Sequence, residues 1–348
     1  MSSGDFLHLH FKGRTTTPWH VGKRRYSNYL YTRDDYLWGR GIRGPLLRQL
    51  WRTFCPKSGA RDGLNFKPER DCSVCSLTSK CPFINLRGSP DEGEFKDRPR
   101  LIITNLWFVG GVEKGRVALA TLDERYLGVV EEKAPVFVEF IREGAKFEFE
   151  VILMGDGVRF ADEVESAIKV SLEFHGWGGF CNEVFGRGVI ESVRKHGFNS
   201  FEYKYVDGSV KSIMDELRRR GSRLRFRISP LLIIDKDSGG FYKSILEKGF
   251  SEKFLNCVNE RYWQFYRRHI HVQDSLLKIF GRARTIMIRG WSRKTGGEKV
   301  FRGIGNEVVL QFGGELGFEE ARALALMRYG VGRYKNQGFG TLTLDMSP

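Results

Sequence analysis

The stretch FEEARALALMRYGVGRYKNQGFGTLTLDM, residues 318–346, decides the fold because it joins three kinds of element in a fixed order. Ala321, Leu324 and Ala325 recur at the spacing of one helix face, which predicts a helix. A loop with four glycines follows, from Gly330 to Gly340. The run TLTLDM after it alternates threonine with leucine and predicts a strand. The order is therefore helix, glycine-rich loop, strand.

The same succession occurs in the middle of the chain. DEVESAIKVSLEFHG, residues 162–176, has helical apolar spacing, and the loop Gly176–Gly188 leads into the β-prone run VIESV at 189–193. Each loop has the outline G-x-G, a gap, then G-x-G, and the gap of the second copy is two residues shorter. The pattern indicates a degenerate internal duplication.

The beginnings of the two halves also correspond. FLHLHFKG at 6–13 and RLRFRISPLLI at 223–233 alternate apolar with polar residues and predict strands. A predicted helix and a predicted strand pair follow each of them, and the second pair is a hairpin that turns near Gly296–Gly297. Each half then reads β-α-β-β-α-β, the ferredoxin-like order that RNA-recognition modules share.

We therefore predict an α+β protein with tandem ferredoxin-like, RRM-like domains that end in glycine-rich loops. The predicted N-terminal domain spans residues 1–200 and has a cysteine-rich insertion at about 55–98. The predicted C-terminal domain spans residues 221–348, and the boundary lies near 196–222.

The charge balance points to a polyanionic partner. The chain has a net charge of +15 and a pI near 9.6, which favours nucleic acid or an anionic membrane. No apolar run is long enough to span a bilayer, and the N-terminus MSSGDFLHLHFKG has no signal-peptide core. We expect a soluble, cytoplasmic protein that binds nucleic acid and no membrane. A basic surface without any partner is the alternative.

Four of the six cysteines lie in one short segment with the spacing C-x16-C-x2-C-x5-C, and these are Cys55, Cys72, Cys75 and Cys81. Four thiolates suit a tetrahedral zinc ion, and the segment is otherwise polar and without an apolar core of its own. The sequence predicts a structural Zn²⁺, and it implies no catalytic metal. Free thiols are the alternative.

Basic residues form two further candidate RNA contacts. GRGIRG at 39–44 fits the dinucleotide-binding pattern, but no β-α-β unit surrounds it, so Arg40 and Arg43 at this helix start are predicted to contact phosphate. On the hairpin, Arg289 and Arg293 flank Trp291, which predicts base stacking beside phosphate pairing. A packed tryptophan beside solvated arginines is the alternative.

A basic and aromatic segment before the first helix offers catalytic groups. His20 could take the proton of an RNA 2′-hydroxyl or protonate the leaving 5′-oxygen. Lys23 would stabilise charge on the phosphorane, and Tyr26 would orient the nucleophile. The alternative is that His20 is an ordinary polar residue.

The closing loop is the strongest candidate for RNA binding. Its four glycines are predicted to let backbone amides approach phosphates, and two cations add charge. These residues are Gly330, Gly332, Arg333, Lys335, Gly338 and Gly340. Tight packing of the loops against the first strand of each half is the alternative.

Three stretches give the chain a family resemblance. GRGIRGPLLRQLW at 39–51, followed by CSVCSLTSKCPF at 72–83, is similar to an R-G-x-L helix and a C-x-x-C…C-P segment of the repeat-associated mysterious proteins of CRISPR systems. GWSRKTGGEKVFRGIGNEVVLQF at 290–312 resembles their late W-x-R…G-x-x-G hairpin. YGVGRYKNQGFGTLTL at 329–344 resembles their closing glycine loop. Within this superfamily the chain looks most like the CRISPR repeat-RNA-processing endoribonucleases.

The resemblance implies binding of CRISPR repeat RNA and metal-independent cleavage to a 2′,3′-cyclic phosphate and a 5′-hydroxyl. It also implies retention of the product, the CRISPR RNA, with other subunits of an effector complex. The family's histidine often lies in or beside the first helix, and GPLLRQLWRTF contains none, so His20 is the nearest substitute. A non-catalytic RNA-binding subunit of such a complex, and a generic RNA-binding protein with structural zinc, are the alternative functions.

Overall fold

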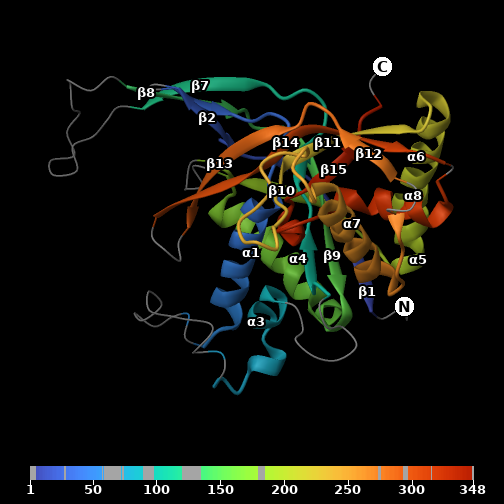
Figure 1. Ribbon diagram of the computed structural model, residues 1–348. Coiled ribbons are helices and arrows are strands. Elements are labelled where there is room, and N and C mark those ends of the chain that lie inside the picture. The colour runs from blue at the N-terminus through green and yellow to red at the C-terminus, as the bar shows by residue number, and fades with distance from the viewer. Residues whose placement is uncertain are drawn as a thin grey trace. The chain divides into compact units, whose positions relative to one another are not determined.

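The computed structural model describes residues 5–26, 29–56, 58, 72, 74–88, 98–119, 135–178, 185–272, 276–292, 297–314 and 316–346 (Figure 1). The chain forms two compact units. The N-terminal unit comprises residues 7–89 and 105–195, and the C-terminal unit comprises 1–6, 90–104 and 196–348. The predicted domain boundaries at 200 and 221 stay predictions.

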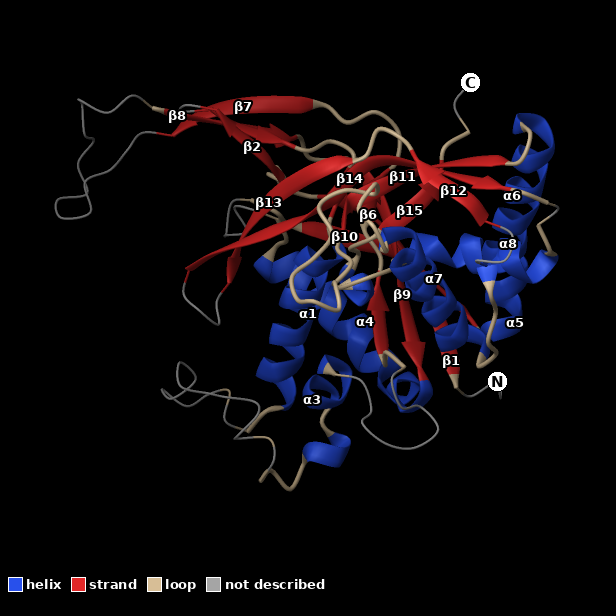
Figure 2. Ribbon diagram, viewed as in Figure 1, coloured by secondary structure: helices blue, strands red, loops and turns tan. Residues whose placement is uncertain are grey.

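The N-terminal unit contains two sheets and three α-helices among its described residues, all of them drawn in Figure 2. Its elements are β1 (Phe6–Thr15), β2 (Gly22–Tyr26), β3 (Tyr29–Thr32), β4 (Tyr36–Leu37), α1 (Gly39–Phe54), α3 (Pro82–Arg87), β6 (Leu106–Phe108), β7 (Lys114–Leu119), β8 (Val136–Ile141), β9 (Lys146–Met154), α4 (Ala161–Val170) and β10 (Gly188–His196). The main sheet has the order β10-β1-β9-β6-β4, and the smaller sheet has the order β2-β3-β8-β7.

The C-terminal unit repeats the main sheet of the first. Its elements are β5 (Leu101–Ile103), α5 (Phe198–Phe201), α6 (Asp207–Arg220), β11 (Arg223–Leu232), α7 (Phe250–Tyr266), β12 (Leu276–Phe280), β13 (Arg284–Ser292), β14 (Gly297–Phe312), α8 (Phe318–Ala325) and β15 (Thr341–Leu344). The sheet order is β12-β14-β11-β15, and β13 pairs with β14. The pairing runs from Arg284–Gly305 to Ser292–Gly297, which is the hairpin that the sequence predicts.

The strand orders establish the duplication. In the N-terminal unit, the fourth, first, third and second strands of the β-α-β-β-α-β succession are β10, β1, β9 and β6, in that spatial order. In the C-terminal unit, the strands of the same ranks are β15, β11, β14 and β12, and they follow the same spatial order. The prediction of an α+β protein with tandem ferredoxin-like domains is therefore confirmed.

Each sheet buries apolar side chains at the positions that the alternation predicts. Leu9 and Phe11 of β1 are fully buried, as is Leu224 of β11, and Phe226 of β11 is almost fully buried. Their burial fixes the register of each first strand, since a slip by one residue would expose all of them.

One stretch expected to be a connection is helical. Residues 196–222 were predicted only as the boundary between the halves, yet they form α5 and α6. Val210 and Ile213 of α6 are buried, and α6 packs against α8. Their spacing of three residues matches a helix face, but polar and basic neighbours obscure it in the sequence.

Candidate nucleic-acid interface

The closing glycine loop binds back onto the end of β11. The amide of Gly340 donates a hydrogen bond to the carbonyl oxygen of Leu231 at 2.9 Å, and the amide of Arg333 donates to Ile233 at 2.8 Å. Within the loop, the amide of Val331 donates to the carbonyl oxygen of Gly340 at 3.0 Å. The loop is therefore hydrogen-bonded to the end of the first strand, and we call this arrangement the glycine clasp.

Glycine is required at two positions of this clasp. A Cβ atom at Gly340 would lie 2.0 Å from the carbonyl oxygen of Val331, and one at Gly332 would lie 2.3 Å from that of Ile233. Both residues also have positive φ values, +60° and +75°, which L-residues rarely adopt. The glycines therefore serve close backbone packing, as the alternative interpretation of these loops predicted.

The mid-chain loop makes the same contacts with the segment after β1. The amide of Gly186 donates to the carbonyl oxygen of Pro18 at 2.9 Å, and the amide of Trp177 donates to Gly186 at 2.8 Å. A Cβ atom at Gly178 would lie 2.8 Å from the carbonyl oxygen of His20. Each contact has its counterpart in the closing loop.

These contacts correct the predicted alignment of the loops. Gly176, Gly178 and Gly186 are the structural equivalents of Gly330, Gly332 and Gly340, so both copies have the spacing G-x-G-x7-G. The predicted two-residue difference in length is wrong. It arose because Gly188 was matched with Gly340, whereas Gly188 is the first residue of β10.

The two cations of the closing loop have different environments. The Arg333 side chain is 55% exposed, and its Nη1 lies 3.2 Å from Asp235 Oδ1. The Lys335 side chain is nearly buried, and its Nζ lies 2.5 Å from Glu260 Oε1. Burial, with Arg261 close by, lowers the pKa of Lys335. Arg333 is therefore the cation of this loop that faces solvent.

A buried arginine, which was not predicted as a site residue, donates hydrogen bonds to the closing loop. Arg261 of α7 is fully buried, and its Nε donates to the carbonyl oxygen of Gly330 at 2.7 Å. Its Nη1 donates to Asn336 Oδ1 at 3.1 Å. Burial lowers the pKa of Arg261 to about 9. The sequence could have indicated this burial, because Arg261 lies three residues after Val258 and four before Phe265, on the apolar face of the helix.

His20 lies inside the N-terminal unit, with 5% of its surface exposed. Its Nδ1 is 2.8 Å from the carbonyl oxygen of Glu139, and because a carbonyl only accepts, Nδ1 bears the proton and Nε2 does not. Burial lowers the pKa of His20. The ring is therefore neutral near pH 7, and Nε2 is the atom that can accept a proton. The side chains of Lys23 and Tyr26 lie outside the described residues, although their backbone belongs to β2.

The predicted phosphate contacts of α1 have unequal surroundings. The guanidinium of Arg43 donates to the carbonyl oxygens of Leu86 at 3.3 Å and Arg87 at 2.7 Å, at the end of α3. Burial, with Arg87 and Arg40 close by, lowers the pKa of Arg43 to about 10. Arg43 therefore joins α1 to α3, while Arg40 is half-buried on the first turn.

The predicted hairpin contacts cannot be placed. The side chains of Arg289 and Trp291 lie outside the described residues, and so does the whole of Arg293.

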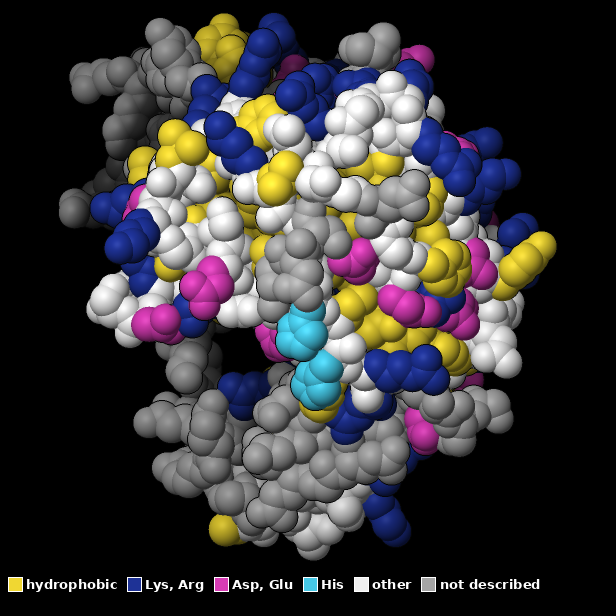
Figure 3. Space-filling view, turned by 45° about the vertical axis from the view of Figure 1, so that its right-hand side comes forward, with side chains coloured by type: hydrophobic (Ala, Val, Ile, Leu, Met, Phe, Trp, Pro, Cys, Tyr) yellow, Lys and Arg dark blue, Asp and Glu magenta, His cyan; other side chains and the backbone are white. Residues whose placement is uncertain are grey.

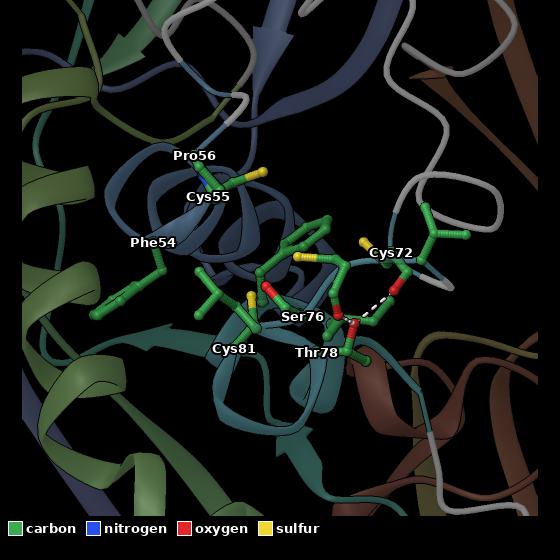
Figure 4. Close-up of a pocket in the computed structure, with 12 residues that line it drawn as sticks. Phe54, Cys55, Pro56, Cys72, Ser76, Thr78 and Cys81 are labelled. Atoms are coloured by element: carbon green, nitrogen blue, oxygen red, sulfur yellow. Dashed lines mark hydrogen bonds between the residues drawn. The ribbon is translucent and has the colours of Figure 1, made fainter.

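The four clustered cysteines line one pocket of about 220 Å³. Cys55 comes from the end of α1, Cys81 from the start of α3 and Cys72 from the intervening segment (Figure 4). Burial, together with the proximity of Cys81, Cys55 and Cys75, raises the pKa of the Cys72 thiol. The described side chains contain no ready-made group of three or more metal ligands, so the thiols share a pocket without metal-binding geometry.

The surface has the basic character that the composition predicts. Lys and Arg side chains recur across the face drawn in Figure 3, interspersed with hydrophobic ones. Among the described residues, no helix combines the length and the apolar character that crossing a bilayer requires.

No model of a known protein family matches the sequence, and no curated protein matches it. Solved structures do resemble the chain. These neighbours include Cas6 and Cmr proteins. Cas6 of Thermus thermophilus is 11% identical, with 98% of each chain covered and a TM-score of 0.41. A Cas6 product complex is 14% identical over 98% of this chain and 99% of that chain, with a TM-score of 0.41.

The Type III-B Cmr-β structure bound to cognate target RNA is 10% identical, with a TM-score of 0.35. That match spans 56% of this chain and 61% of the Cmr chain.

Proposed function

We propose that the protein is a CRISPR RNA-processing endoribonuclease of the repeat-associated mysterious protein superfamily. The observation that carries this proposal is the duplicated helix, glycine clasp and strand, whose second copy coincides with the most specific stretch of family resemblance, residues 329–344. The net charge of +15 supports a polyanionic substrate. The substrate in this proposal is CRISPR repeat RNA, and the retained product joins other effector subunits.

The proposed reaction needs no metal ion. The RNA 2′-oxygen attacks the adjacent phosphorus, and the bond from phosphorus to the 5′-oxygen breaks. The products are a 2′,3′-cyclic phosphate and a 5′-hydroxyl. His20 Nε2, which lacks a proton, accepts the proton of the 2′-hydroxyl, and the leaving 5′-oxygen takes a proton from water. Lys23 stabilises charge on the phosphorane, and Tyr26 orients the nucleophile.

One observation favours the alternative, a non-catalytic RNA-binding subunit of an effector complex. His20 is almost completely buried, and a general base must reach within hydrogen-bond distance of the proton that it removes. Incubation with repeat RNA in EDTA separates the two functions. Cleavage at one site that is lost in His20→Ala supports the enzyme. Tight binding without cleavage, in the wild type and the variant alike, supports the binding subunit.

The proposal includes a structural zinc ion held by Cys55, Cys72, Cys75 and Cys81. The support is chemical, because four thiols from three segments line one pocket, and a bound zinc ion would draw them into the geometry that they lack here. Zinc would supply cross-linking there and no catalysis, since four thiolates complete a tetrahedral site.

A further inference from the structure

An exposed histidine and three arginines form a second basic site in the N-terminal unit. Arg48 and Arg52 lie one turn apart on the exposed side of α1, and Arg187 directly precedes β10. His175 is exposed and ends the helical turn Ser171–His175 that follows α4. Arg52 Nη1 donates to His175 Nε2 at 3.0 Å. We term these four residues the His175 cluster.

Two of the three arginines, Arg52 and Arg187, have no carboxylate partner among the described residues. Over the described part of the chain, the Arg52 guanidinium has a hydrogen bond to His175 and none to a carboxylate. Arg187 Nε is buried and has no hydrogen-bond partner among the described residues. Cations gathered around a neutral imidazole repel one another unless an anion is bound, so the arrangement is typical of an anion site.

The electrostatics of His175 agree with this interpretation. Burial, followed by Arg52, Arg48 and Arg187, lowers the pKa of His175. Glu173, on the same helical turn, is the acidic residue nearest in sequence and is exposed. A bound phosphate would reverse the balance by stabilising the protonated imidazole.

An exposed aromatic residue is the sequence neighbour of His175. Phe174 precedes His175 and is 59% exposed, which is unusual for a phenylalanine in a folded chain. Single-stranded nucleic acids are bound by cations that follow the backbone and by aromatic rings that stack on bases. Cations and an exposed ring at adjacent positions fit that combination better than they fit a free inorganic anion.

We propose that the His175 cluster binds a phosphodiester group of single-stranded RNA, with Phe174 as the stacking surface for a neighbouring base. The inference rests on the proposed RNA-binding function and deepens it. It assigns RNA contacts to four residues and a ring that differ from the contacts predicted in the closing glycine loop, at the start of α1 and on the hairpin.

Binding at this site couples to a proton. A free His175 is neutral near pH 7, and a bound phosphate favours its charged form, so the complex takes up a proton. RNA affinity therefore rises as the pH falls through the pKa that His175 has in the complex, and it levels off below the lowered pKa of the free protein. His175→Gln keeps a group that can accept from Arg52 and removes this dependence on pH.

The first test measures binding of a labelled 2′-O-methyl oligouridylate, which its own 2′-oxygens cannot cleave. Arg52→Ala weakens binding about tenfold, the usual effect of losing a charged hydrogen bond. It also reduces the magnitude of the slope of log K against log salt by about 0.7. Arg142→Ala is the matched control, because it removes one exposed arginine that pairs with Glu113 at 3.8 Å. Equal affinities of Arg52→Ala and Arg142→Ala overturn the inference.

The second test separates this inference from the proposed function. The pKa of His175 is measured by NMR with inorganic phosphate and with chloride at equal ionic strength. We expect phosphate to raise it in the wild type and to have less effect in Arg187→Ala. An unchanged pKa overturns the site even if RNA binds the protein. A raised pKa in a protein that binds no RNA upholds the anion site and overturns the proposed function.

Discussion

The amide of Gly340 donates a 2.9 Å hydrogen bond to the carbonyl oxygen of Leu231, and so joins the last loop of the C-terminal unit to its first strand. The same bond joins Gly186 to Pro18 in the N-terminal unit. Two loops separated by about half the chain thus close their domains in one way. The glycine-rich loops are therefore elements of the fold, whose backbone packing closes each domain.

Gly340→Ala tests the clasp. The added Cβ would lie 2.0 Å from the carbonyl oxygen of Val331, at a backbone φ of +60°. We expect the free energy of unfolding to fall by about 2–4 kcal/mol, from backbone strain and overpacking together. Gly314→Ala is the control, because no atom lies within 4 Å of its Cβ position. Equal denaturation midpoints for the two variants would contradict the clasp.

Arg261→Ala tests the buried support under the closing loop. The change leaves the Gly330 carbonyl oxygen without its 2.7 Å donor and opens a cavity. We expect a loss of about 2–4 kcal/mol in the free energy of unfolding. Arg268, which is exposed and lies two residues beyond the end of α7, gives the control, since Arg268→Ala should change stability by less than about 0.5 kcal/mol. An unchanged free energy of unfolding in Arg261→Ala would show that the loop does not depend on Arg261.

The cysteine pocket predicts a metal content that can be measured. Elemental analysis of the purified protein should give close to one equivalent of zinc, and Cys75→Ser should lower it strongly because four-thiolate sites need all their ligands. Cys257→Ser is the control, since this cysteine lies on α7, outside the pocket. A zinc content below about half an equivalent in the wild type would reject the site.

The proposed role of His20 predicts the pH dependence of cleavage. Burial lowers the pKa of His20 below its ordinary value, so the imidazole is already deprotonated at neutral pH. The cleavage rate should be flat above about pH 7 and should fall with acid below about pH 6.5. A rate that still rises tenfold per unit between pH 7 and 9 would assign the base to another group.

Much of the fold could be predicted from local patterns. The alternation in β1 and β11 and the helical spacing before each glycine loop indicate the element order, and the strand orders confirm the duplication. Helices α5 and α6 were not predicted, because their few apolar residues are scattered among charged ones. The loop register was also missed, because Gly188 offered a competing G-x-G match, and the backbone contacts identify Gly186 as the equivalent of Gly340.

The site was harder to predict than the fold. Sequence patterns identify residue types, but they do not show which cations are engaged in contacts within the protein. Lys335 is nearly buried in its ion pair with Glu260, and Arg43 binds the end of α3, whereas Arg333 pairs with Asp235 and still remains exposed. His175 carried no motif at all. Its significance depends on the approach of Arg52 and Arg187, which come from segments far apart in the chain.

The chemistry of the RNA ends tests the central claim most directly. Repeat RNA is incubated with the protein in EDTA, and the products are analysed by mass spectrometry. The account predicts one cleavage site, a 2′,3′-cyclic phosphate on the upstream fragment and a 5′-hydroxyl on the downstream fragment. Intact RNA, or fragments with a 5′-phosphate that form only when a divalent cation is supplied, would contradict it.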